Sequence, residues 1–189
     1  MVEPMSKRFI GATMVALLIT AVLSACSITD HKNLSGNAAR DAATAVVENS
    51  IKTFAEKGGT ETLSVAKKEF VLIYDPSAPK GKQVVTANLA DKTTPTFDDP
   101  KSISINALKT LLASDIMKDA EFKLSDNVFT ITGKDFVIEL HTQNDLVMTS
   151  VITGKATGSS VPQIVVSAYG ISKEAKKLFD SAVEPATAQ

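Results

Sequence analysis

Cysteine, tryptophan and histidine are scarce in this chain of 189 residues. It contains one cysteine, no tryptophan and two histidines, and aromatic residues make up only 5% of the total. A single cysteine excludes an internal disulfide, so the folded state has to be stabilised by packing. Because apolar residues still make up 44% of the chain, we expect one globular domain whose core is built mainly from Val, Ile, Leu and Phe.

The shortage of histidine limits the chemistry available, because histidine is the usual general base and metal ligand. His31 lies in a polar segment without periodicity, which leaves His141 for a folded site, beside Glu139 on the outward face of a strand. The sequence also lacks HExxH, CxxC, GxSxG, EF-hand and P-loop motifs. We therefore predict a protein that is not an enzyme, with no catalytic residues, metal or cofactor. An enzyme with an unrecognised site near His141 is the alternative.

Arginine is almost absent, because Arg8 and Arg40 are the only two. The formal net charge is −1, and after the Lys7-Arg8 pair the longest basic runs are the pairs Lys67-Lys68 and Lys176-Lys177. Nucleic-acid and phosphate sites depend on arginine forks and on clustered basic side chains. We therefore expect no nucleic-acid partner.

The first 25 residues have the layout of a secretory signal peptide. Lys7 and Arg8 form a short basic region, residues 9–23 carry no charge, and the small residues Ser24 and Ala25 follow. An apolar run of about 15 residues is short for a helix that crosses about 30 Å of hydrocarbon. We therefore expect an export signal that starts at Met1 or Met5.

The four residues 23–26, "LSAC", resemble the lipobox of bacterial lipoproteins. The resemblance implies that the signal peptide is cleaved before Cys26 and that Cys26 carries a lipid. It places the mature protein on the exported side of the cell membrane or the outer membrane, with the membrane as a partner through this lipid. Ser27 favours the outer membrane in a diderm host, whereas in a monoderm host it is uninformative.

The rest of the chain predicts an α+β domain. After a tether at 26–36, a helix is expected at 37–57, with Asn37 as its N-cap and Gly58-Gly59 at its end. Its apolar stripe consists of Ala39, Ala43, Val46, Val47, Ser50, Ile51 and Phe54. Further helices are expected at 104–118, capped by Ser104, and at 171–183, with a frayed tail at 184–189. Residues 68–75 and 82–89 predict an N-terminal hairpin, and short alternating runs between 121 and 169 predict a meander of about five strands. The expected architecture is a twisted antiparallel sheet with helices packed on one face, forming a single domain over 37–183.

Two kinds of binding function follow from this architecture. The long segment 90–103 predicts a site for a protein or polymer partner, because loops of that length are uncommon unless functional. The order of elements also resembles that of the LolA-like and LppX/LprG-type lipoproteins. This resemblance implies a lipid carrier with an apolar cavity between the sheet and helices 104–118 and 171–183. Leu111, Ile138 and Leu178 would then face the lipid, whereas in a filled core they would simply pack.

Overall fold

The computed structural model describes residues 33–66, 68–88, 96–98, 103–155 and 162–183, with the backbone alone for 96–98 and 183. By its internal contacts the chain divides after Asp30, and every described residue belongs to the second unit, His31–Gln189. The predictions for the signal peptide, Cys26, the tail 184–189 and most of the segment 90–103 lie outside the described residues.

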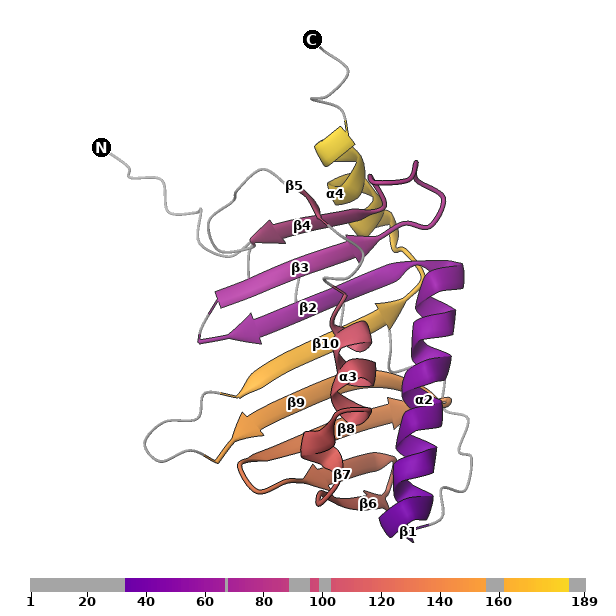
Figure 1. The fold of residues 1–189 in the computed structure, drawn as a ribbon. Helices are drawn as coiled ribbons and strands as arrows, with labels where there is room; N and C mark the ends of the chain where they lie inside the picture. The colour runs from indigo at the N-terminus through magenta and orange to yellow at the C-terminus, as the bar shows by residue number, and fades with distance from the viewer. Residues whose placement is uncertain (1–32, 67, 89–95, 99–102, 156–161, 184–189) are drawn as a thin grey trace, which may run out of the picture. The chain divides into compact units, whose positions relative to one another are not determined.

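The described strands form one antiparallel sheet (Figure 1). They are β1 Leu34–Ser35, β2 Gly59–Val65, β3 Lys68–Tyr74, β4 Val84–Asn88, β5 Thr96–Asp98, β6 Glu121–Ser125, β7 Val128–Thr132, β8 Phe136–Gln143, β9 Leu146–Gly154 and β10 Gln163–Tyr169. The sheet is ten-stranded, in the order β1-β6-β7-β8-β9-β10-β2-β3-β4-β5. Two meanders, β2–β5 and β6–β10, therefore join side by side where β10 pairs with β2.

The expected α+β class with a twisted antiparallel sheet is confirmed, and β6–β10 form the predicted five-stranded meander. The sheet is larger than expected, because the predicted hairpin is part of a four-stranded unit. Strand β2 was missed because Glu61 occupies one of its inward, buried positions, where an apolar residue is the usual signal. The two-residue strand β1 lies within the predicted tether, so the last residues of 26–36 belong to the fold.

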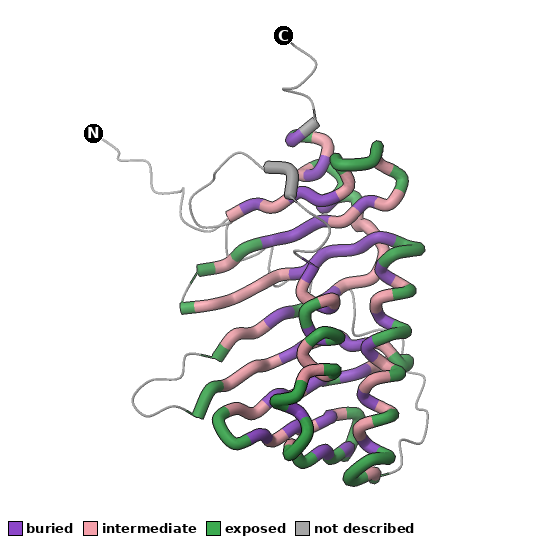
Figure 2. Tube along the Cα trace, in the orientation of Figure 1, coloured by how far each residue is buried: buried purple, intermediate pink, exposed green. Residues whose placement is uncertain are grey.

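Two helices, α2 (Gly36–Lys57) and α3 (Ser104–Leu112), pack on what we call the inner face of the sheet (Figure 1). Along α2, exposed and buried positions alternate with the helical turns (Figure 2). The buried positions are Ala39, Ala43, Val47, Ser50 and Phe54, which agrees with the predicted stripe. Small alanines let α2 lie close to the strands, and the core beneath it includes Phe122, Ile131, Ile138 and Leu140.

The third helix, α4 (Lys173–Val183), packs on the opposite, outer face of the sheet. This differs from the prediction, which placed all the helices on one face. Ala175, Phe179 and Ala182 of α4 contact Val71 and Ile73 of β3, whereas Leu72 and Tyr74 belong to the inner core. The reason is the apolar run "FVLIY" in β3. A strand that is apolar on both sides has to be covered on both faces.

The ends of the helices differ in part from the predictions. Ser35, and not Asn37, occupies the N-cap position of α2, while Gly58 ends the helix as expected, with a φ of 66° and its N–H donated to the carbonyl of Phe54. Helix α3 stops at Leu112 and not at 118, and a short 3-10 turn, η2 (Asp115–Met117), follows it. Within the described residues, no helix is both long and apolar enough to cross a membrane.

Candidate functional site

A buried carboxylate fixes α3 to the sheet. Glu61 is 2% exposed, and its two carboxylate oxygens accept the backbone N–H groups of Ser104, at 2.5 Å, and Ile105, at 3.0 Å. These are N–H groups of the first turn of α3, which have no partner inside the helix. Ser104 was expected to cap this helix itself. In the structure the cap comes from a side chain of β2, which lies more than 40 residues earlier in the chain.

Burial dominates the electrostatics of this carboxylate. It raises the pKa of Glu61 above its ordinary value of 4.5, although the hydrogen bonds from Ser104 and Ile105 act in the opposite direction. Burial likewise raises the pKa of Tyr169 to about 12, and the negative charge of Glu61 adds to this effect. Both groups therefore have a structural role at neutral pH. Both oxygens of Glu61 accept hydrogen bonds from α3, and the hydroxyl of Tyr169 keeps its proton.

A second set of hydrogen bonds attaches α2 to the sheet. Ser50 donates its hydroxyl hydrogen to the carbonyl of Val46 at 2.8 Å and accepts the N–H of Val147 at 2.9 Å. The hydroxyl of Tyr169 donates to the carbonyl of Val147 at 2.7 Å. The ring of Phe54 lies 5.9 Å from the rings of both Tyr74 and Tyr169. These contacts fix the C-terminal half of α2 to β9, β10 and β3.

The two inner-face helices enclose a small groove, which we call the α2–α3 groove. It has a volume of about 130 Å³ and is lined by Thr44, Val47, Glu48, Lys109, Leu112 and Ala113. Its lining is mostly apolar, and a Glu48–Lys109 ion pair at 3.2 Å joins the two helices at its rim. Because both charged side chains are about half exposed, this ion pair contributes little to stability. The groove is accessible to a ligand that brings a small apolar group.

His141 lies where the sequence placed it, on the outer face beside Glu139. The two side chains are 47% and 46% exposed, and His141 Nε2 lies 3.6 Å from Glu139 Oε2. The opposite side of this strand carries Ile138 and Leu140, which are fully buried, so the predicted register is confirmed. Among the described residues, no group of three or more His, Cys, Asp or Glu side chains is placed to hold a metal ion.

The three side chains expected to face a carried lipid do not line one space. Ile138 is fully buried in the inner core and Leu111 packs against that core, but Leu178 belongs to the cluster beneath α4 on the outer face. The sheet itself separates Leu178 from the other two. Among the described residues, helices α3 and α4 therefore pack against separate clusters and do not border one common space.

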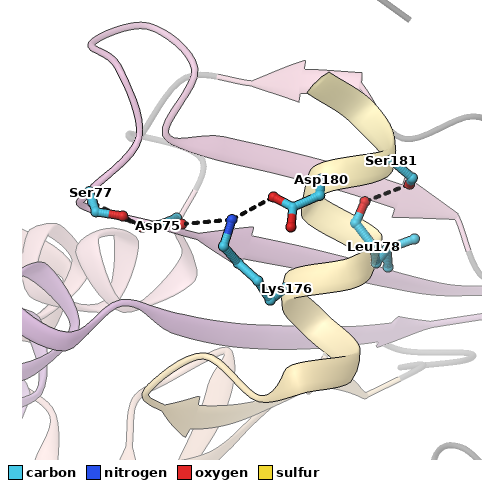
Figure 3. Close-up of polar contacts among 6 residues, drawn as sticks. All are labelled: Asp75, Ser77, Lys176, Leu178, Asp180 and Ser181. Atoms are coloured by element: carbon cyan, nitrogen blue, oxygen red, sulfur yellow. Dashed lines mark hydrogen bonds and ion pairs between the residues drawn. The ribbon is translucent and has the colours of Figure 1, made fainter. Parts of the chain in front are cut away.

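A polar cluster joins the first two turns of α4 to the end of β3 (Figure 3). Asp75 is 4% exposed; its Oδ1 accepts the N–H of Ser77 at 2.9 Å, and its Oδ2 lies 3.7 Å from Nζ of Lys176. Lys176 also contacts Asp180 at 2.5 Å, one turn further along the helix, and this contact is the main cause of the raised pKa of Lys176. This cluster joins the β3–β4 turn to α4 and needs no ligand to complete it.

No protein-family model matches the chain, and no curated protein is significantly similar to it. Sequence reasoning missed Glu61, the most buried acidic side chain described, and it missed the α2–α3 groove. A signal for Glu61 did exist, because a lone acidic residue alternates with threonines in "TETLS". Its partner could not be identified from the sequence, because the cap depends on a contact between distant segments.

Proposed function

We propose that this protein is a lipid-anchored protein of the bacterial cell envelope whose α+β domain binds a protein partner and performs no catalysis. The leader and the "LSAC" motif support acylation of Cys26. The fold also sets the length of the tether between Cys26 and the domain, because β1 begins at Leu34. A tether of about seven residues spans about 25 Å when fully extended. The lipid on Cys26 would therefore keep the domain close to the membrane.

The volume of the α2–α3 groove favours a protein side chain over a lipid as the occupant of this groove. Sites for lipids and other drug-sized molecules usually measure about 300–1,000 Å³. The groove measures about 130 Å³, close to the roughly 150 Å³ that holds one benzene-sized group. It therefore suits a single apolar side chain, such as a Leu or Phe, presented by another protein. Side chains seated in such small pockets often supply most of the binding energy of an interface.

The positions of the titratable groups support a binding function over an enzymatic one. His141 and Glu139 lie on an open sheet face, half exposed to water. Both oxygens of Glu61 are used by α3. A catalytic base needs access to a substrate in a site that limits water, and neither of these carboxylates, nor His141, has that environment.

The anchor is tested on Cys26 itself. In the wild-type protein, the mass of the N-terminal peptide from the membrane fraction should correspond to an acylated Cys26 with the leader removed. Cys26→Ala should leave the leader uncleaved and abolish this peptide, while Ser27→Ala serves as the matched control that keeps acylation. An unmodified cysteine in the wild-type membrane fraction contradicts the proposal.

The groove is tested by filling it. Ala113→Trp places an indole at the groove, whereas Ala55→Trp adds the same ring to an exposed position of α2 about two turns away. With a photo-crosslinking residue at Lys109, we expect one discrete crosslinked partner that Ala113→Trp removes and Ala55→Trp preserves. Native and denaturing mass spectra of the mature protein provide the opposing test. One additional, non-covalent lipid per chain would favour the carrier function instead.

A further inference from the structure

The cap that Glu61 provides for α3 depends on the charge of its carboxyl group. Three donors meet this group: the N–H groups of Ser104 and Ile105, at 2.5 Å and 3.0 Å, and the side-chain hydroxyl of Ser104. A carboxylate accepts all three hydrogen bonds, because both of its oxygens act only as acceptors. A neutral carboxyl group carries a hydrogen on one oxygen, which becomes a donor and a weaker acceptor. Protonation of Glu61 therefore weakens the hydrogen bond from at least one N–H group of α3.

Protonation also removes a favourable charge from the start of α3. The first N–H groups give a helix N-terminus a partial positive charge, which a carboxylate stabilises more than a neutral acid does. Helix α3 has nine residues, Ser104–Leu112, and its N-cap residue, Ile103, makes no side-chain hydrogen bond. An isolated helix of this length is marginal in water, so contacts with other elements decide whether its first turn stays formed. Glu61 supplies the contact that satisfies this turn.

The helix that this cap holds forms one wall of the α2–α3 groove. Helix α3 supplies Lys109, Leu112 and Ala113 to the lining, and α2 supplies the other lining residues. Ile105 lies about one helical turn before Lys109, so a displacement of the first turn is carried to the groove. Helix α2 is fixed separately, through the hydrogen bond between Ser50 and β9. A weaker cap therefore moves one wall of the groove relative to the other.

The surroundings of Glu61 let the domain stay folded when this group is protonated. Among the described residues, its partners in the sheet, Leu72 and Ser167, carry no charge, and neither do the first turn of α3 and the buried stripe of α2. Burial among these groups raises the pKa of Glu61 above its ordinary value of 4.5. Tyr169 is the titratable neighbour whose charge interacts with Glu61, and it keeps its proton because burial raises its own pKa to about 12. Protonation of Glu61 thus relieves the cost of a buried charge while it weakens the cap, so the change stays local.

We propose that Glu61 is a proton-controlled latch on α3: its carboxylate holds the α2–α3 groove in the form that binds a partner, and its protonation in acid releases the first turn of α3 and weakens that binding. The inference rests on the proposed function, because it adds regulation to the groove proposed there as the partner site. The loss of binding should occur as the pH falls through the folded-state pKa of Glu61, which lies above 4.5. A protein on the exported side of a membrane meets the pH of its surroundings directly, so the partner would bind at neutral pH and be released in acid.

The first test follows the latch itself, in the full mature protein in detergent and without a partner. The carboxyl carbon of Glu61, identified by NMR as the signal that Glu61→Gln removes, should titrate with an apparent pKa above 4.5. Over the same pH range, hydrogen exchange corrected for its intrinsic pH dependence should become about tenfold faster in the peptide that covers α3, as the weakening of one charged hydrogen bond predicts. The peptide that covers α4, on the outer face, is the internal control and should not change. Glu61→Gln should show fast exchange in α3 at every pH, and circular dichroism should show a folded domain throughout.

The second test follows binding. Crosslinking of the partner from a photo-crosslinking residue at Lys109 should fall at least fivefold in the otherwise wild-type protein as the pH falls through the titration of Glu61. With Glu61→Gln, crosslinking should be low at every pH. Glu48→Gln and His141→Ala are the matched controls, because they remove ionisable groups at the rim of the groove and on the outer face. Both controls should keep the wild-type pH dependence.

The contrary results overturn the inference. Titration of Glu61 at or below 4.5, unchanged exchange of α3 across the titration, or equal acceleration in Glu61→Gln would show that the cap does not depend on its charge. Loss of the pH dependence in Glu48→Gln would assign the effect to the rim of the groove. The failure of the proposed function has a different result. If nothing crosslinks from Lys109 at any pH while the exchange of α3 still follows the titration of Glu61, the groove is not a partner site, although the latch on α3 exists.

Discussion

Glu61 provides the most direct test of the energetics of the fold. Glu61→Ala removes both hydrogen-bond acceptors from the first turn of α3 and leaves the buried N–H of Ile105 without a partner. The loss of a helix cap costs about 0.5–2 kcal/mol, and an unsatisfied buried donor costs about 1–3 kcal/mol. We therefore expect Glu61→Ala to lower the free energy of unfolding by about 3 kcal/mol, measured by urea denaturation and circular dichroism.

Glu61→Gln separates the hydrogen bond from the charge. The amide keeps one acceptor oxygen and removes the carboxylate whose burial raises the pKa of Glu61. Its effect should therefore stay within about 1 kcal/mol at neutral pH, because one lost charged hydrogen bond is offset by relief of desolvation. Glu139→Gln on the exposed outer face is the matched control, and we expect it to change the free energy of unfolding by less than about 0.5 kcal/mol.

The pH dependence gives the sign of the electrostatic effect. Since the pKa of Glu61 is higher in the folded state, the folded state binds this proton more tightly than the unfolded state. The associated stability is fully present below the ordinary pKa of 4.5 and is lost as the pH rises through the folded-state pKa. Wild type should therefore lose stability relative to Glu61→Gln as the pH increases above 4.5. A gain over this interval would mean that the hydrogen bonds outweigh burial and would refute the reasoning.

Three further changes have outcomes that follow from the described contacts. His141→Ala should leave both the melting temperature and the biological function nearly unchanged; a complementation assay in which function fails while the melting temperature holds would point to a site at His141. Gly59→Ala should destabilise the fold by more than about 1 kcal/mol, because its Cβ would lie 2.7 Å from the ring of Phe54, and near-wild-type unfolding in urea would contradict that close packing. Asp75→Ala should cost about 1–2 kcal/mol, because it leaves the N–H of Ser77 without its acceptor, whereas the exposed Asp180→Ala should cost less than about 0.5 kcal/mol; equal losses would show that the ion pair with Lys176 matters more than the buried turn.

The part of the fold that was predictable from the sequence is the part set by local rules. The strand pairs β6–β7 and β8–β9 are joined at "DN" and "ND", and Asp126, Asn127, Asn144 and Asp145 all have positive φ values, as tight hairpin turns require. The helical stripe of α2 and its end at Gly58 were also readable, because they depend on spacing and on one glycine.

The remainder depends on contacts between distant segments. Strand β2 is stabilised by pairing with β10, about a hundred residues later, and its inward Glu61 is compatible with burial only because α3 begins above it. Nothing in the local sequence "GTETLSV" indicates that the N–H groups of α3 will satisfy the buried carboxylate of Glu61. The division of the helices between the two faces of the sheet likewise depends on which helix covers each side of β3, and periodicity within one helix does not determine this. The α2–α3 groove is set by the separation of two helices and has no sequence pattern of its own.

The stability of the fold and the proposed binding are coupled at the junction of the two meanders. Glu61 and Gly59 of β2 pair there with Ser167 and Tyr169 of β10. Tyr169 contacts Phe54 in the last turn of α2, and Glu61 fixes the start of α3. The same junction therefore sets the separation of the two helices that line the groove. If this coupling holds, Glu61→Ala should weaken crosslinking of a partner from Lys109 even in the fraction that stays folded, although Glu61 itself lies beneath the groove surface. A folded Glu61→Ala variant with undiminished crosslinking would show that the packing of Leu112 holds α3 in place without the cap, and that the groove is independent of the junction.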